Sequence, residues 1–146
     1  YPDIKFEEMY VDACAMNLIR QPEKFDVVVT TNLFGDILSD ESSQVVGGLG
    51  MAPAANLGDD FALFEPVHGA AFDIAGQNIA NPSSFLLSIK MMLDWLGAKH
   101  NDQKCFEMAT KLESTIFNLV KSGIKTKDIG GDVTTTEFTK QITDNL

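Results

Sequence analysis

Residues 32–41 read NLFGDILSDE, and this stretch decides how the rest of the chain is interpreted. Phe34 and Leu38 belong to an apolar stripe at helical spacing, which predicts a helix here. Asp36 and Asp40 are four positions apart, so both carboxylates project from the face opposite that stripe. Two like charges at this spacing destabilise a helix slightly unless a positive charge lies between them.

This acid pair has two explanations. A solvated helix face accounts for it without any function. Alternatively, carboxylate oxygens are hard ligands, and one or two of them, with substrate oxygens and waters, suit Mg²⁺ or Mn²⁺. A third acid, Asp12, lies on a helix predicted over residues 8–20, away from the apolar stripe of that helix. Taken by itself, Asp12 is also a surface acid.

The segments around this helix predict further elements. Residues 25–31, FDVVVTT, form a short β-branched run typical of a buried strand in a parallel sheet. The glycine-rich residues 47–58 predict a loop, and the main structural division of the chain is expected there. A short strand is expected at residues 62–65.

Three helices are predicted in the remainder of the chain. The first begins at Asn81-Pro82 and ends at Gly97, and its nearly continuous apolar surface predicts burial almost all round. The second covers residues 102–121. Thr134 and Glu137 have the spacing of a capping box at the start of the third.

Composition limits the classes of function. The chain has 146 residues, is 45% hydrophobic and carries a net charge of −10, which disfavours nucleic acid and anionic membranes as partners. No apolar run reaches the roughly 20 residues that span a bilayer, and the first residues do not resemble a signal peptide. Cys14 and Cys105 lie in apolar helical patterns and are predicted to be buried thiols, which fits a reducing compartment.

Three motifs, taken together, resemble a known family. Residues 10–13 (YVDA), 25–30 and 32–41 resemble the signature of the β-decarboxylating dehydrogenases, which include isocitrate, homoisocitrate, isopropylmalate and tartrate dehydrogenases. The resemblance implies that Asp12, Asp36 and Asp40 bind Mg²⁺ or Mn²⁺. It further implies that Asp12 reaches the site of a partner subunit, so that a homodimer or a hetero-oligomer of related subunits is expected.

The chemistry implied by this resemblance is an oxidative decarboxylation of a 2-hydroxy acid. Hydride leaves the alcohol carbon for NAD, and the resulting β-keto acid loses CO₂. The enolate left behind is stabilised by the cation, so Asp12 and Asp36 act in catalysis through the metal.

A second block, residues 65–76 (EPVHGAAFDIAG), continues to Asn81 and resembles the cofactor-binding loop of the family. It is not the G-x-G-x-x-G fingerprint of dinucleotide-binding folds. Phe72 stands where many relatives have proline. The resemblance implies contacts to NAD from Glu65, His68, Gly69, Ala70, Ala71, Asp73, Ile74, Asn81 and Asp128.

Asp73 is the most informative of these residues. A carboxylate accepts hydrogen bonds from both ribose hydroxyls and repels a 2′-phosphate, which favours NAD over NADP. Without the surrounding block, Asp73 reads equally well as a helix cap, and His68 as a hydrogen-bonded loop residue. Residues 128–138 form a third match, expected beside the adenine, although a turn and a helix cap explain them equally well.

The implied fold is α/β, the isocitrate/isopropylmalate dehydrogenase-like two-domain fold, of which this chain would be the C-terminal part. Residues 1–46 would belong to the small, dimer-forming domain, and residues 47–146 to the returning part of the large, dinucleotide-binding domain. The arginines that bind substrate, and the acid–base tyrosine and lysine, would lie in an N-terminal remainder. The chain has one arginine, Arg20, so by itself it is expected to be inactive.

The hydroxy acid remains open at this level. Residues 47–58 favour isocitrate, followed by homoisocitrate and 3-isopropylmalate. A noncatalytic regulatory subunit of a hetero-oligomeric isocitrate dehydrogenase is the alternative function, and a purely structural α/β interaction domain is a third. The expected compartment is the cytoplasm or the mitochondrial matrix.

Overall fold

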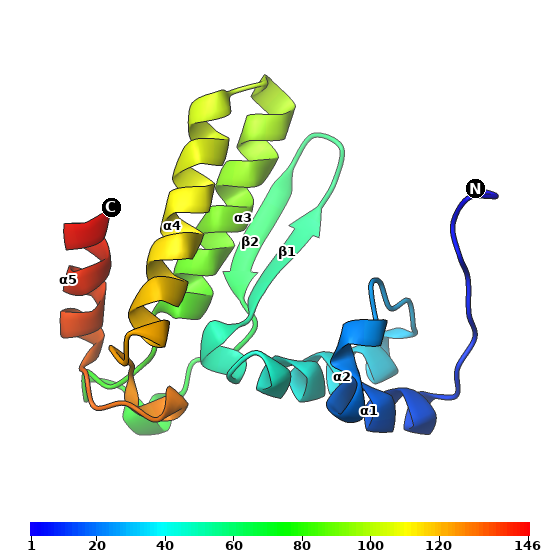
Figure 1. Cartoon of the computed structure of the whole chain (residues 1–146), viewed down its shortest axis with the longest axis horizontal. Coiled ribbons are helices and arrows are strands. Elements are labelled where there is room, and N and C mark those ends of the chain that lie inside the picture. Colours follow the sequence, from blue (N-terminus) through cyan, green and yellow to red (C-terminus); the bar gives the residue numbers. More distant parts are fainter. The chain divides into compact units, whose positions relative to one another are not determined.

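The computed structural model describes residues 1–146, which divide into two compact units, Tyr1–Val46 and Gly47–Leu146 (Figure 1). Five α-helices and two β-strands make up the regular structure. None of the helices combines the length and the apolar character needed to cross a bilayer.

The first unit is a pair of helices with a small core. Helix α1 (Val11–Arg20) is followed by a 3₁₀ turn (Pro22–Lys24), and helix α2 covers Asn32–Val45. The buried apolar side chains are Cys14, Leu18 and Leu38. Cys14 and Leu18 are one helical turn apart, so both face α2 across the contact between the two helices.

The strand predicted at residues 25–31 does not form. This segment belongs to neither a helix nor a strand, and Val27 and Val29 are 80% and 91% exposed. A strand requires a neighbour to satisfy its backbone hydrogen bonds, and both strands of the structure pair with each other in the second unit. Phe25 packs against the core of the helix pair, and residues 26–31 lie exposed without a ladder partner.

The second unit begins with a β-hairpin. Strand β1 (Pro53–Leu57) pairs antiparallel with β2 (Ala62–Pro66), with Pro53 opposite Pro66 and Leu57 opposite Ala62. The strand predicted at residues 62–65 is confirmed, whereas β1 lies inside the predicted loop. Proline, alanine and asparagine have low strand propensity, so the pairing with β2, rather than local preference, produces this strand.

Helix α3 (Ser83–His100) lies against both strands of the hairpin (Figure 1). The Ser84 hydroxyl donates to the Ala52 carbonyl at 2.5 Å, and the Ser88 hydroxyl donates to the Glu65 carbonyl at 2.7 Å. These two bonds pair hairpin carbonyls with buried helix hydroxyls, which avoids the cost of unsatisfied polar groups.

The end predicted for α3 at Gly97 is wrong, because the helix continues to His100 and is followed by Asn101 in the left-handed conformation. Gly97 is buried where helix α4 (Gln103–Lys121) returns beside α3. A Cβ on Gly97 would stand 3.0 Å from the Phe106 ring. The glycine therefore serves close helix packing rather than helix termination.

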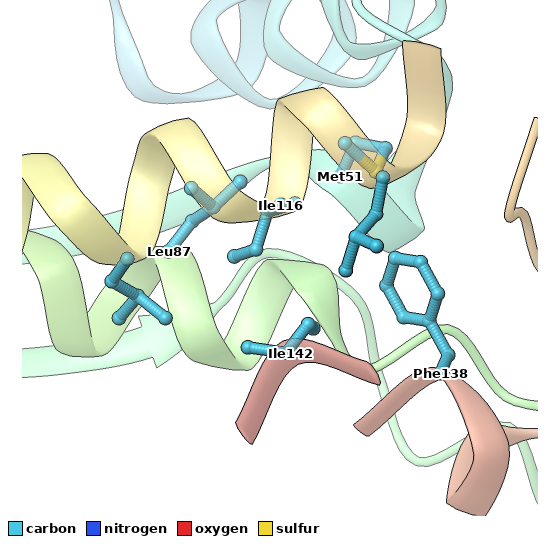
Figure 2. Close-up of a cluster of buried hydrophobic side chains, with 7 residues drawn as sticks. Met51, Leu87, Ile116, Phe138 and Ile142 are labelled. Carbon is cyan, nitrogen blue, oxygen red and sulfur yellow. The ribbon is translucent and has the colours of Figure 1, made fainter. Parts of the chain in front are cut away.

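The core of the second unit lies between α3, α4 and the last helix, α5 (Thr135–Asn145). Figure 2 shows side chains from these three helices and Met51 converging on one region. The buried members are Met51, Leu87, Leu112, Ile116, Leu119, Phe138 and Ile142. Both cysteines are free thiols; Cys14 is buried, as predicted, whereas Cys105 is half-buried rather than buried.

The predicted capping box at the start of α5 is confirmed. The Glu137 carboxylate accepts from the Thr134 backbone N–H at 2.9 Å and from its hydroxyl at 2.7 Å. These bonds, the backbone one foremost, hold the pKa of the Glu137 carboxyl below its usual value of 4.5. The box orients α5 so that Phe138 enters the core.

Replacement of Phe138 by alanine tests this core. Phe138 has no exposed surface, so the Phe138→Ala variant is expected to lose about 3–5 kcal/mol of unfolding free energy. Urea denaturation followed by circular dichroism measures the change. The matched control is Phe61→Ala, at a side chain 86% exposed in the hairpin loop, which is expected to lose no more than about 0.5 kcal/mol. Equal losses for both variants would contradict the assigned core.

The capping box predicts a pH dependence. Folding lowers the pKa of Glu137, so the carboxylate stabilises the native state above its unfolded pKa, and this stabilisation disappears as the pH falls through the lower folded pKa. The range from about pH 6 to about pH 3 spans the usual titration of carboxyl groups. Over this range the melting temperature of the wild type should therefore fall more than the melting temperature of Glu137→Gln. Parallel pH profiles for the two proteins would contradict the assignment.

Candidate functional site

Helix α2 presents the first group of candidate residues. Leu38 is buried in the helix pair, which leaves Asp36 and Asp40 on the exposed side one turn apart. Ser39 and Ser43 donate their hydroxyls to the backbone carbonyls of Asp36 and Asp40. Neither carboxylate takes part in a hydrogen bond or a salt bridge within the chain.

Asp12 is also exposed, at the start of α1, where one carboxylate oxygen accepts from the Ala13 N–H at 2.8 Å. The structure does not bring Asp12, Asp36 and Asp40 into one group, and no cluster of three potential ligands occurs within the chain. The sequence assigned Asp12 to a site shared with a partner subunit, and this assignment stays a prediction.

The second group of candidates lies on the loop between β2 and α3. The loop turns sharply at Ala71 and Asn78, which have φ of 45° and 58°, and at Gly76. Between these turns, residues Phe72–Ile74 form a 3₁₀ turn. The Gln77 side chain donates to the Asp73 carbonyl at 2.7 Å, while the Asp73 carboxylate is exposed and has no partner.

The residues before this turn differ in burial and in hydrogen bonding. The His68 ring is half-buried, with Nδ1 2.9 Å from the Gly69 carbonyl. A Cβ on Gly69 would meet nothing within 4 Å, so the packing of the chain leaves open space there. Glu65 is engaged by the hairpin, because its carboxylate accepts from Asn56 across the two strands at 3.2 Å.

Asn81 ends the loop and is 9% exposed. Its side-chain amide donates to a carboxylate oxygen of Asp128 at 3.0 Å, and its carbonyl oxygen accepts from the Ser83 N–H at 3.0 Å. The other Asp128 oxygen accepts from the Thr126 hydroxyl at 2.6 Å. The structure thus joins two predicted site residues that are 47 positions apart in the sequence.

A second connection holds the same end of the loop. The Asn78 carbonyl accepts from the Thr135 N–H at 2.9 Å, and the Asn78 side-chain oxygen accepts from the Thr136 N–H and hydroxyl at 3.1 and 2.9 Å. The Thr135 hydroxyl donates to the Ala80 carbonyl at 2.6 Å. Sequence reasoning missed Asn78 as a supporting residue, because no local pattern reveals that a loop asparagine contacts a helix start far along the chain.

The candidate residues for a metal and for a dinucleotide therefore differ in whether their side chains already have partners within the chain. Asp36 and Asp40 offer two unpartnered carboxylates suited to a hard divalent cation. Asp73 offers an unpartnered carboxylate suited to hydroxyl groups, and open space adjoins Gly69. Asn81 and Asp128 are instead bonded to each other and to their own segments.

Comparison with known proteins covers almost the whole chain. The model of the isocitrate/isopropylmalate dehydrogenase family matches residues 1–145. The 3-isopropylmalate dehydrogenase of Sulfurisphaera tokodaii is 51% identical over 144 residues, which are 98% of this chain and 43% of that protein. The isocitrate/homoisocitrate dehydrogenase of Thermus thermophilus is 49% identical over 146 residues, which are 100% of this chain and 42% of that protein.

A solved structure agrees with the same assignment. The crystal structure of isocitrate dehydrogenase from Methylococcus capsulatus superimposes with a TM-score of 0.89 at 42% sequence identity, covering 99% of this chain and 42% of that one. The chain thus spans about two fifths of the length of the relatives that it matches, and the predicted fold class is confirmed. The chain belongs to the isocitrate/isopropylmalate dehydrogenase family.

Proposed function

We propose that this chain is the C-terminal portion of an NAD-dependent, metal-dependent β-decarboxylating dehydrogenase, to which it supplies metal-binding aspartates and much of the dinucleotide site. The family match over residues 1–145 carries this proposal. The relatives include isopropylmalate and isocitrate/homoisocitrate enzymes at nearly equal identity. Among the candidate hydroxy acids we place isocitrate first on residues 47–58, followed by homoisocitrate and 3-isopropylmalate.

The metal site would use Asp36 and Asp40, with Asp12 contributed by a second subunit. The two unpartnered carboxylates on the exposed side of α2 would hold the ion together with the hydroxyl and carboxylate oxygens of the substrate. A bound Mg²⁺ or Mn²⁺ would supply Lewis-acid stabilisation of the negative oxygen that develops when CO₂ leaves.

The dinucleotide site would use the loop between β2 and α3. The Asp73 carboxylate has no protein partner, so it is free to accept both ribose hydroxyls, and it would repel the phosphate that distinguishes NADP. The open space at Gly69 lets a ligand approach the backbone there. His68, Ala70, Ala71 and Ile74 would line the same loop, and Glu65, Asn81 and Asp128 would border it.

The first unit would form the dimer interface of the small domain. Its two helices leave several large apolar side chains exposed, and exposed apolar surface of this kind is suited to covering by a protein partner. The exposed side chains on α1 and α2 are Met16, Ile19, Leu33, Phe34, Ile37 and Val45. A partner subunit that covers these side chains would also bring its own Asp12 toward the metal. Residues 47–146 of this chain would serve as the dinucleotide-binding part of the large domain.

Catalysis is proposed for the longer protein rather than for these residues alone. Substrates of this class carry two or three carboxylates, whose binding needs several cationic groups. The chain contains a single arginine, Arg20. The remaining cationic and acid–base groups are therefore expected on the N-terminal remainder of the enzyme.

Replacement of Asp36 by asparagine tests the metal site. In the full-length protein, Asp36→Asn removes a charged ligand at nearly constant volume, and NADH formation with Mn²⁺ and the best of the three hydroxy acids should fall by about 10³-fold. Isothermal titration with Mn²⁺ in the presence of substrate should show weakened binding. Glu23→Gln, at an exposed acid of the 3₁₀ turn, is the matched control. Unchanged activity in Asp36→Asn, or a wild type inactive on all three acids, would contradict the proposal.

Replacement of Asp73 tests the choice of dinucleotide. Asp73→Asn keeps the shape but removes the negative charge, so kcat/KM for NAD should fall about tenfold while that for NADP falls less or rises. Steady-state assays with both dinucleotides give the ratio. The control is Asp59→Asn at an exposed acid of the hairpin loop, where the ratio should not move. A ratio that Asp73→Asn leaves unaltered would argue against ribose recognition.

A further inference from the structure

Gly50 lies in the 3₁₀ turn Leu49–Met51, directly against the Asn81–Asp128 pair. A Cβ on residue 50 would stand 2.6 Å from Asp128 Oδ2, 3.0 Å from Asn81 Cβ and 3.3 Å from Asn81 Nδ2. The first of these distances is far inside van der Waals contact. Only glycine therefore fits at this position while the Asn81–Asp128 hydrogen bond is kept.

Backbone conformation does not explain this glycine. Gly47 and Gly48, just before it, have φ of 118° and 99°, which side chains rarely adopt, whereas Gly50 is absent from the residues with positive φ. An alanine at position 50 would be acceptable to the backbone itself. The requirement for glycine comes from the neighbouring side chains alone.

The Asn81 and Asp128 side chains, which Gly50 contacts, are held in place by hydrogen bonds. Both polar atoms of the Asn81 side chain are engaged, the nitrogen by Asp128 and the Met51 sulfur and the oxygen by the Ser83 N–H. Asp128 is held in turn by the fully buried Thr126. A side chain whose polar atoms are all hydrogen-bonded in one orientation is held in that orientation. It also holds the backbone segment that carries it.

We propose that Gly50 is a positioning residue of the dinucleotide site, acting through Asn81 and Asp128, an inference that rests on the proposed function. The missing side chain lets the Asp128 carboxylate reach the Asn81 amide. That bond anchors the end of the loop whose earlier residues, Asp73 among them, face the dinucleotide. A methyl group at position 50 displaces Asp128, releases the Asn81 amide and lets the loop shift from the geometry that binds NAD.

A purely structural role makes a different prediction, and Gly97 provides the matched control. Its absent side chain also clears a tight contact, 3.0 Å to the Phe106 ring, but between α3 and α4 and outside the loop. Gly97→Ala therefore strains the same unit without touching Asn81 or Asp128. Loss of stability alone should affect both variants, whereas loss of NAD affinity should be confined to Gly50→Ala.

The experiment measures NAD affinity by isothermal titration, and KM and kcat by steady-state assay, in the full-length protein. Gly50→Ala should raise the Kd for NAD about tenfold, the effect of losing a hydrogen bond to a charged group. The KM for NAD should rise with it while kcat changes little, because ground-state and transition-state binding weaken equally. Gly97→Ala should lower Tm and leave the Kd for NAD unchanged.

A double-mutant cycle then tests the route of the effect. In an Asp128→Ala background the closest clash is gone, so adding Gly50→Ala should raise the Kd by about threefold or less. Thr126→Val is nearly isosteric and removes the donor that holds Asp128. It should raise the Kd in the same direction, and it provides the test if Gly50→Ala does not fold.

Two results would overturn the positioning role while leaving the proposed function intact. One is an unchanged Kd for NAD in Gly50→Ala or, if that variant does not fold, in Thr126→Val. The other is a rise in Kd of the same size with and without the Asp128 side chain. A wild-type protein that binds no NAD overturns the proposed function together with this inference, so the two failures are distinguishable.

Discussion

Helix α3 has a nearly continuous apolar surface, and the other elements of the second unit cover most of it, although Phe85 is 56% exposed. The hairpin packs along it, α4 returns beside it, and the core side chains of α4 and α5 meet its apolar positions (Figures 1 and 2). Burying such a helix also buries polar groups of its neighbours, and the Ser84 and Ser88 hydroxyls satisfy two of them at the hairpin. Because the loop that carries the dinucleotide candidates leads directly into α3, the placement of this helix fixes one end of the site.

Local features of the structure could be predicted from the sequence, while features that depend on a distant partner could not. The capping box of Thr134 and Glu137 is complete within four residues, and it forms as predicted. Gly97 has the local signature of a helix end, but its neighbour is Phe106 on the following helix, so the helix continues through it. Residues 25–31 have the composition of a buried strand, yet composition supplies no partner strand, and residues 26–31 stay exposed. The opposite error occurs at β1, where pairing with β2 creates a strand that propensity does not favour.

The candidate site divides in the same way. A long motif identifies residue types, so Asp36, Asp40 and Asp73 could be named in advance, and the structure adds that their carboxylates have no protein partner. The hydrogen bond between Asn81 and Asp128, and the capping of α5 by Asn78, join segments too far apart for any spacing rule. Asp12 could be named from the motif as well, but its proposed role requires a second subunit, so it stays a prediction.

Trp95 gives the hairpin an optical signal of its own. It is the only tryptophan of the chain, and it lies on α3 in edge contact with Phe64 of β2, their ring centroids 6.2 Å apart. The Lys99 ammonium stands 4.5 Å from the indole centroid and also donates to the Asp60 carbonyl in the hairpin loop. A cation so close to an indole alters its fluorescence, and this cation is held in place by the hairpin. Detachment of the hairpin from α3 would free the ammonium and expose the indole together, so the emission of Trp95 reports this local event without any introduced label.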